Sequence, residues 1–216
     1  MNSVIQINES HPEHAGPEPL KREDLPVDTA ALARFLIGKL VVRALPDMLA
    51  GGRIVETEAY ITGDQASHSF RGITPRNKVM FGPPGYAYVY LAYGVSFMLN
   101  VTSAEQGIGE AVLIRAAEPV MGLDAMRRLR GDVPARDLMR GPGRLAKALD
   151  IDRRFDGTDL CSVGTLWLAG DGKQAGEIGM SVRIGITRDA DRPLRFFLKG
   201  SKFVSGPASL NGKASF

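Results

Sequence analysis

Two glutamates and a tyrosine alternate in the stretch GRIVETEAY, which reads as a β-strand whose alternate side chains share one face. Glu56, Glu58 and Tyr60 would therefore point the same way. The following loop supplies His68, and the apolar run AVLIRAAEP contains Arg115, a charge that needs a buried partner. Such groups, converging beside aromatic rings, are typical of a hydrolytic pocket. Glutamates on a solvated strand face are the ordinary alternative, and the apolar surroundings disfavour it.

Other catalytic chemistries have weaker support in the sequence. Glu56, Glu58, Asp64 and His68 could form a ligand set, but the chain has three histidines, one cysteine and no HExxH pair, so we expect no metal site. A serine nucleophile would need a GxSxG turn, which the sequence lacks. Cys161 has no catalytic signature around it and is expected to be a buried structural thiol. The stretch GPGRLAKAL does not fit the phosphate-binding pattern GxxxxGK[ST].

Four of the five tyrosines lie in the stretch FGPPGYAYVYLAYGVSFMLNVTS, which predicts a hairpin. Phenol faces stack on flat, electron-poor rings and hold a cationic ring best. Tyr90 is expected to form a wall of the pocket opposite Tyr60. Tyr86 and Tyr88 are expected to pack in the core and at the sheet edge.

Tyr93 directly precedes Gly94, so its ring is expected on a protruding turn. An aromatic ring at such a tip, beside a basic surface, is suited to wedging between stacked bases. Enzymes that act on a base must first rotate it out of the duplex, and a wedge offsets part of that cost.

The net charge of +3 and the pI near 9.1 conceal a basic segment. Residues 127–154 hold nine Arg or Lys against four Asp. A segment of this kind attracts phosphates. A solvated helix surface explains the same charges and remains an open alternative.

The length of 216 residues fits a single domain, and the 44% hydrophobic and 24% charged residues are typical of a globular chain. One cysteine permits no internal disulfide, so we expect a cytoplasmic protein in a reducing environment. No stretch reaches the length of a membrane span, and the N-terminus does not read as a secretory signal, so no membrane partner is expected.

The predicted elements alternate irregularly. A helix should begin at Asp28 or Thr29 and end at Gly38, and a long ordered loop should span 61–85. VMGLDAMRRLR and GRLAKALDI also read as helices. The other predicted strands are KLVVRAL, GEAVLIRAAEP, GTLWLAG, MSVRIGIT and LRFFLKG. Because these elements show no βαβ rhythm, we predict an α+β fold: a single domain with a mainly antiparallel curved sheet and surrounding helices.

The boundaries of this domain are expected at residues 26 and 206. Residues 1–25 are polar, contain three prolines and read as a flexible N-terminal arm. Residues 207–216 are expected to form a C-terminal tail.

Several motifs together resemble one family. GRIVETEAY, ASHSFRGITPRN, PGYAYVYLAYG, FMLNV, AVLIRAAEP, GPGRLAKAL and PLRFFLKGS occur in an order similar to that of the alkyladenine (3-methyladenine) DNA glycosylases of the animal type, which also have bacterial members. The similarity runs from Leu32 to Ser205. Members of this family hydrolyse the N-glycosidic bond of alkylated or deaminated purines, as the first step of base excision repair.

The resemblance implies a catalytic pair. Glu58 matches the residue that activates the attacking water, and Arg115 matches the active-site arginine, which is expected to orient Glu58 or to bind a nearby phosphate. The family pattern has no lysine at the reacting position, so hydrolysis without strand cleavage is expected. No cofactor is expected.

The resemblance also implies how the base is held. Tyr60, His68 and Tyr90 match the walls of the base pocket, and Tyr93 matches the intercalating residue. Asn100 matches a residue at the pocket floor that disfavours the amino group of guanine. Its side chain could instead tie down a neighbouring backbone group, because Asn in an apolar strand needs a reason.

DNA backbone contacts are expected from Arg71, Arg76, Arg144 and Lys147. The sequence departs from some relatives at Ser96, where they carry an aromatic residue, and this bears on the groove contact around Tyr93. The expected partner is double-stranded DNA with damaged purines, bound by a monomer.

Two alternatives stay open. A non-catalytic nucleic-acid-binding module on the same fold would use the basic segment and Tyr93 without turnover. A metal-dependent hydrolase acting on nucleotides would lose its activity to a chelator. Removal of 3-methyladenine and 7-methylguanine is expected, and the neutral bases hypoxanthine and ethenoadenine are further candidate substrates.

Overall fold

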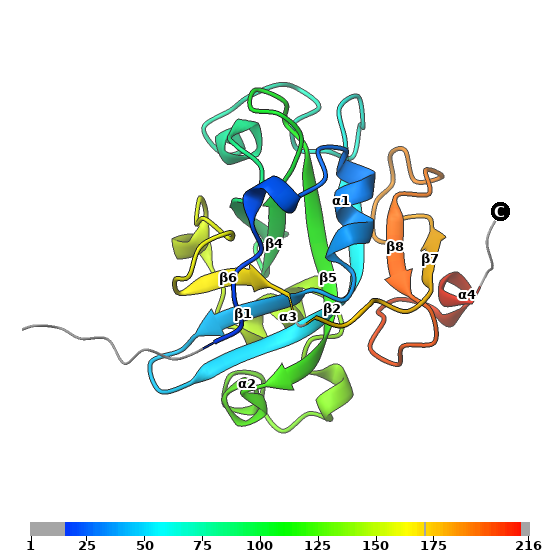
Figure 1. The fold of residues 1–216 in the computed structure, drawn as a ribbon. Helices are drawn as coiled ribbons and strands as arrows, with labels where there is room; N and C mark the ends of the chain where they lie inside the picture. The colour runs from blue at the N-terminus through cyan, green and yellow to red at the C-terminus, as the bar shows by residue number, and fades with distance from the viewer. Residues whose placement is uncertain (1–15, 171, 213–216) are drawn as a thin grey trace, which may run out of the picture.

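A curved, antiparallel sheet of eight strands forms the centre of the molecule in a computed structural model, which describes residues 16–170 and 172–212. The strand order is β3-β4-β5-β2-β1-β6, and β8 pairs with both β2 and β7 (Figure 1). The prediction of an α+β domain with an antiparallel sheet is confirmed. The strands are β1 (Leu40–Ala44), β2 (Leu49–Tyr60), β3 (Ala87–Ala92), β4 (Ser96–Thr102), β5 (Ala111–Met121), β6 (Leu166–Ala169), β7 (Ile178–Ser181) and β8 (Arg195–Leu198).

Short helices surround the sheet. Figure 1 shows α1 in front of the long strands, α2 at the lower end of β5, and α4 beside β7 and β8. The start of α1 follows the predicted cap: the Asp28 carboxylate accepts the Ala31 N–H at 2.7 Å, and Gly38 at φ 87° follows the helix. The helices are α1 (Thr29–Leu36), α2 (Leu123–Arg130), α3 (Pro142–Ala148) and α4 (Ala208–Asn211).

The long strand β2 organises the site because three other strands pair with it: β1, β5 and β8. Its register with β5 shifts on both sides of Glu56, which leaves Val55 of β2 and Arg115 of β5 without a direct partner. Bulges of this kind bend a strand and re-aim side chains. Here the irregularity brings the Arg115 guanidinium to the glutamates of β2.

The long loop between β2 and β3 is ordered, as predicted. Its side chains form hydrogen bonds with backbone groups that strand pairing would otherwise satisfy. Asn77 Oδ1 accepts the Thr74 N–H at 2.6 Å, and Asn77 Nδ2 donates to the carbonyl oxygens of His68 and Gly72 at 2.8 and 3.0 Å. A 3₁₀ helix, Lys78–Phe81, then leads into the hairpin.

One predicted strand is wrong in position. The stretch 180–187 was expected to be extended, whereas β7 ends at Ser181 and a loop follows. The chain leaves the sheet because the Arg183 side chain is buried against Asp64 and the Ile184 N–H bonds the Glu58 carboxylate. The apolar spacing of this stretch therefore reflects contacts with the site and not strand pairing.

The predicted arm is described from residue 16 onward, and residues 1–15 lie outside the described residues. Residues 16–25 lie against the fold: Pro19 forms a β-bridge with Ala169, and Leu25 is buried. The indole N–H of Trp167 donates to the Pro17 carbonyl at 2.9 Å.

Of the predicted C-terminal tail, residues 213–216 are outside the described part, whereas α4 packs beside β7 and bonds Arg195. None of the helices in residues 16–170 and 172–212 has the length and apolar character that a bilayer span requires.

Candidate active site

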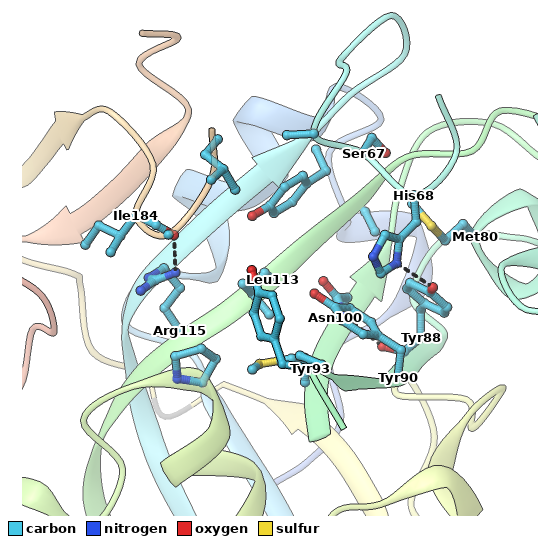
Figure 2. Close-up of a pocket in the computed structure, with 18 of the residues that line it drawn as sticks. Ser67, His68, Met80, Tyr88, Tyr90, Tyr93, Asn100, Leu113, Arg115 and Ile184 are labelled. Carbon is cyan, nitrogen blue, oxygen red and sulfur yellow. Dashed lines mark hydrogen bonds between the residues drawn. The ribbon is translucent and has the colours of Figure 1, made fainter. Parts of the chain in front are cut away.

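A cavity of 440 Å³ opens where β2 to β5 meet the loops that follow β2 and β7. Seven of the predicted residues line it: Tyr60, His68, Arg76, Tyr90, Tyr93, Asn100 and Arg115. Figure 2 shows Arg115 and Ile184 facing His68, Tyr88 and Asn100 across the opening. The volume lies within the range of small-molecule sites, and the lining combines aromatic rings with a few polar groups.

One wall is a cluster of three rings. The His68 and Tyr90 centroids are 4.4 Å apart at 67°, and the Tyr88 ring lies 5.5 Å from Tyr90. Tyr88 is buried, as expected for a packing residue, but its hydroxyl also bonds His68 Nδ1 at 2.9 Å (Figure 2). Burial, assisted by the charge of Arg76, lowers the pKa of His68, so the imidazole is neutral at pH 7. This wall therefore offers an uncharged aromatic surface.

Tyr60 makes no ring contact with that cluster within the described residues; its hydroxyl donates to Glu58 Oε2 at 3.0 Å. The Arg183 guanidinium lies 4.7 Å from its ring centroid. Burial and the adjacent Glu58 carboxylate raise the pKa of Tyr60, so the phenol keeps its proton and acts as a donor.

Glu58 is fully buried behind the cavity wall and bonded on both oxygens. Oε2 accepts from Tyr60 and lies 3.1 Å from Arg115 Nη1, while Oε1 accepts the Ile184 N–H at 2.8 Å. Arg115 Nη1 also donates to the Ile184 carbonyl at 3.5 Å (Figure 2). All three partners line the cavity, so the carboxylate, which does not line it, lies directly behind its wall.

The pKa values of the two glutamates of β2 are shifted in opposite directions. Burial raises the pKa of Glu58, more than Arg115 and the Ile184 N–H lower it. Burial also opposes ionisation of Glu56, but the charges of Arg115 and Arg195 outweigh it and hold that pKa below its ordinary value. The surroundings therefore favour the charged form of Glu56 more than that of Glu58, so Glu58 accepts a proton more readily than Glu56 does.

Asn100 makes the contact expected of a structural residue and also lines the cavity. Its Nδ2 donates to the Tyr88 carbonyl at 3.0 Å, and only 3% of the residue is exposed. This bond fixes the amide on the cavity floor between β3 and β4.

Tyr93 and Gly94 lie in the three-residue connection 93–95 between β3 and β4, with φ of 50° and 70°, and the Val95 N–H donates to the Ala92 carbonyl at 3.0 Å. Positive φ at both positions is typical of a hairpin turn whose twist matches its strands. Tyr93 is 91% exposed and also lines the cavity. A side chain at Gly143 of α3 would meet Ser96 at 2.7 Å, so α3 packs closely beside the base of this hairpin.

The four basic residues expected at DNA are all exposed. Arg76 lines the cavity and lies 5.9 Å from the Tyr90 ring centroid, and Arg71 lies in the same loop. Arg144 and Lys147 project from α3, and Arg144 Nη1 lies 3.4 Å from Asp137 Oδ1.

The four residues considered as metal ligands do not form a ligand set: some are paired with arginines, and they do not gather at one point. Asp64 is buried against Arg183, with Nη2 at 2.9 Å, and Glu56 is held by two arginines. Within the described ranges, no three His, Cys, Asp or Glu side chains gather as a metal ion would need. Cys161 is half-buried, less than expected, and burial raises its pKa.

The sequence reasoning did not identify two buried arginines that support the site. Arg195 contacts Glu56, and Arg183 contacts Asp64 and the Tyr60 ring. Arg195 lies in the apolar stretch PLRFFLKG, so the argument applied to Arg115 would also have identified it. No local signal marks Asp64.

Comparison with known proteins gives a consistent result. A model of the methylpurine-DNA glycosylase family matches residues 23–202. Three relatives carry the name "Putative 3-methyladenine DNA glycosylase". That of Mesorhizobium japonicum is 63% identical and covers 96% of this chain and 97% of its own. That of Paraburkholderia phytofirmans is 50% identical, with coverages of 89% and 90%, and that of Methanoculleus marisnigri is 48% identical, with 82% and 94%.

Proposed function

Because the chain belongs to the methylpurine-DNA glycosylase family, we propose that it removes 3-methyladenine and 7-methylguanine from duplex DNA after flipping the damaged nucleotide into the cavity. The observation that carries this proposal is the buried Glu58 carboxylate, held by two residues that line an aromatic cavity, Tyr60 and Arg115. DNA glycosylase activity follows from the family; the lesions and the flipping are the proposal.

In the proposed reaction the base lies against the rings of His68, Tyr90 and Tyr60. Methylation at position 3 or 7 makes a purine cationic, and each tyrosine face favours that charge by roughly 0.5–2 kcal/mol. Glu58 takes a proton from water, whose oxygen bonds to the anomeric carbon. The N-glycosidic bond breaks, its electron pair leaves with the base, and the cationic purine departs neutral. The Glu58 charge also stabilises the developing oxocarbenium.

The proposal is tested with duplexes that each carry one defined lesion. After incubation with the protein, alkali cleaves the abasic sites and the fragments are measured. We expect strand breaks at 3-methyladenine and 7-methylguanine only after alkali treatment, because no lysine attacks the sugar. Tight binding without abasic sites would instead support the non-catalytic module, and loss of activity with a chelator would support a metal-dependent hydrolase.

Tyr93→Ala should slow capture of the flipped nucleotide, because the ring would no longer fill the gap in the base stack. The melting temperature should not change, since Tyr93 is 91% exposed. Fluorescence of a base analogue at the flipped position measures capture. Val163→Ala, which truncates another exposed side chain outside the cavity, is the control. Unchanged fluorescence and excision in the Tyr93 variant would refute the role of Tyr93 as the intercalating residue.

The exposed charges of α3 should appear in the salt dependence of DNA binding. If Arg144 and Lys147 contact phosphates, replacing both with alanine should reduce the slope of log affinity against log salt by about 0.9 per contact. Replacing Arg127 and Arg128 of α2 removes the same charge at the far end of β5 and should leave the slope unchanged. A wild-type slope in the variant that lacks Arg144 and Lys147 would identify the α3 face as merely solvated.

Asn100→Ser should open space at the cavity floor and admit the 2-amino group of guanine. Undamaged guanine is abundant, so the pocket needs a repulsive element. We expect measurable abasic sites at normal guanine, or at guanine opposite thymine, with a smaller change for 3-methyladenine. The melting temperature is measured alongside, because the bond to the Tyr88 carbonyl is also lost. Background guanine release from a folded, active variant would exclude this role.

A further inference from the structure

Four buried side chains of alternating charge form a network of consecutive ion pairs behind the cavity. Arg195 Nε lies 2.7 Å from Glu56 Oε1, which lies 3.0 Å from Arg115 Nε. Arg115 Nη1 then lies 3.1 Å from Glu58 Oε2. Arg195, Glu56 and Glu58 are fully buried and Arg115 is 7% exposed. A buried charge persists only where it is paired and hydrogen-bonded, and in this network each side chain has a partner of opposite charge.

Arg195, at the end of this network that lies farthest from Glu58, is held by the C-terminal part of the protein. Arg195 donates to Ser181 Oγ at 2.8 Å, to the Ser205 carbonyl at 3.1 Å and to Asn211 Oδ1 at 2.7 Å. The Ser205 N–H donates to the second Glu56 oxygen at 2.6 Å. Glu56 therefore has donors on both oxygens, and its position depends on residues that do not reach the cavity.

We propose that Arg195, anchored by the segment that ends in α4, is a positioning residue for base excision: it holds Glu56, and through Glu56 it fixes Arg115 against the Glu58 carboxylate. The inference rests on the proposed function, in which Glu58 is the base. A guanidinium shared between two carboxylates is drawn toward the one that is less neutralised by other groups. Because Arg195 neutralises Glu56, Arg115 keeps Nη1 for Glu58.

The positioning role predicts that changes at Arg195 and at Glu56 have opposite effects on the acid limb of the pH–rate profile, the range in which the excision rate rises with pH. Groups that face Glu58 are Tyr60 of β2, Tyr90 of β3, Arg115 of β5, and Arg183 in the loop after β7. Glu56 adds a negative charge that supports the raised pKa of Glu58, after the larger effect of burial. Removing that charge should ease ionisation of Glu58, whereas removing Arg195 should hinder it.

The experiment measures single-turnover excision of 7-methylguanine as a function of pH. This cationic base needs no protonation to leave, so the acid limb reports the ionisation of Glu58. We expect Arg195→Gln to move the limb to higher pH and Glu56→Gln to move it to lower pH, each by about half a unit or more. Lesion-DNA affinity should change little, because neither residue lines the cavity.

Asn211→Ala removes one contact of Arg195 without unpairing a charge, so it serves if the other variants do not fold. It should move the limb in the direction of Arg195→Gln. Arg43→Gln is the control for stability: Arg43 is 7% exposed and lies on β1, outside the cavity. It should lower the melting temperature without moving the limb.

Unmoved limbs, or limbs that move in the same direction in Arg195→Gln and Glu56→Gln, would overturn the positioning role and leave these residues as structural. If neither variant folds, an unmoved limb in Asn211→Ala overturns it. A wild-type rate with no acid limb, or an active Glu58→Gln variant, would instead refute the role of Glu58, and a wild-type protein that does not excise 7-methylguanine would refute the proposed function.

Discussion

Glu58→Gln should reduce single-turnover excision of 3-methyladenine by about 10²–10⁴-fold or more, while lesion-DNA binding persists. The amide keeps the shape of the side chain, and its oxygen can still accept from Tyr60, Arg115 or Ile184. It cannot take a proton from water at neutral pH. The measurement is the rate of abasic-site formation with enzyme in excess, together with the dissociation constant for the same duplex.

Two further variants assign the effect to one carboxylate. Glu118→Gln changes a half-exposed glutamate of β5 outside the cavity and should match the wild-type rate. Glu56→Gln should retain turnover, because Glu56 is separated from the cavity by Arg115. If the Glu58 variant turned over normally and the Glu56 variant were inactive, the general base would be Glu56.

Local pattern was sufficient where the relevant residues are close in sequence. Alternation placed Glu56, Glu58 and Tyr60 together, and the structure brings all three to Arg115 or to each other. The run AVLIRAAEP identified Arg115, because a charge inside an apolar strand must have a partner. The cap at Asp28 follows from chemistry within one turn.

Contacts between distant segments could not be read in this way. Arg195 bonds a glutamate that lies 139 residues earlier, and Arg183 bonds Asp64, 119 residues earlier. The apolar spacing of 180–187 predicted a strand, but two long-range contacts pull this segment away from the sheet. The register shift around Glu56 has no local signature either, although it determines where the Arg115 guanidinium points.

The Asp64–Arg183 pair should have the largest effect on stability. Both side chains are fully buried, and they join the loops that follow β2 and β7. Asp64→Ala leaves the Arg183 guanidinium buried without its carboxylate, which should lower the free energy of unfolding by about 3–5 kcal/mol. Urea denaturation at neutral pH measures the loss. Asp124→Ala breaks the exposed pair with Arg127 and should cost less than about 1 kcal/mol.

A double variant separates the unpaired charge from the missing contacts. Adding Arg183→Met to Asp64→Ala removes the buried charge and places an apolar side chain in its position, so part of the lost stability should return. The recovery should be incomplete, because Arg183 also donates to the Ala59 and Asp189 carbonyls and lies against the Tyr60 ring. If the double variant were less stable than Asp64→Ala, those contacts, and not the ion pair, would hold the two loops together.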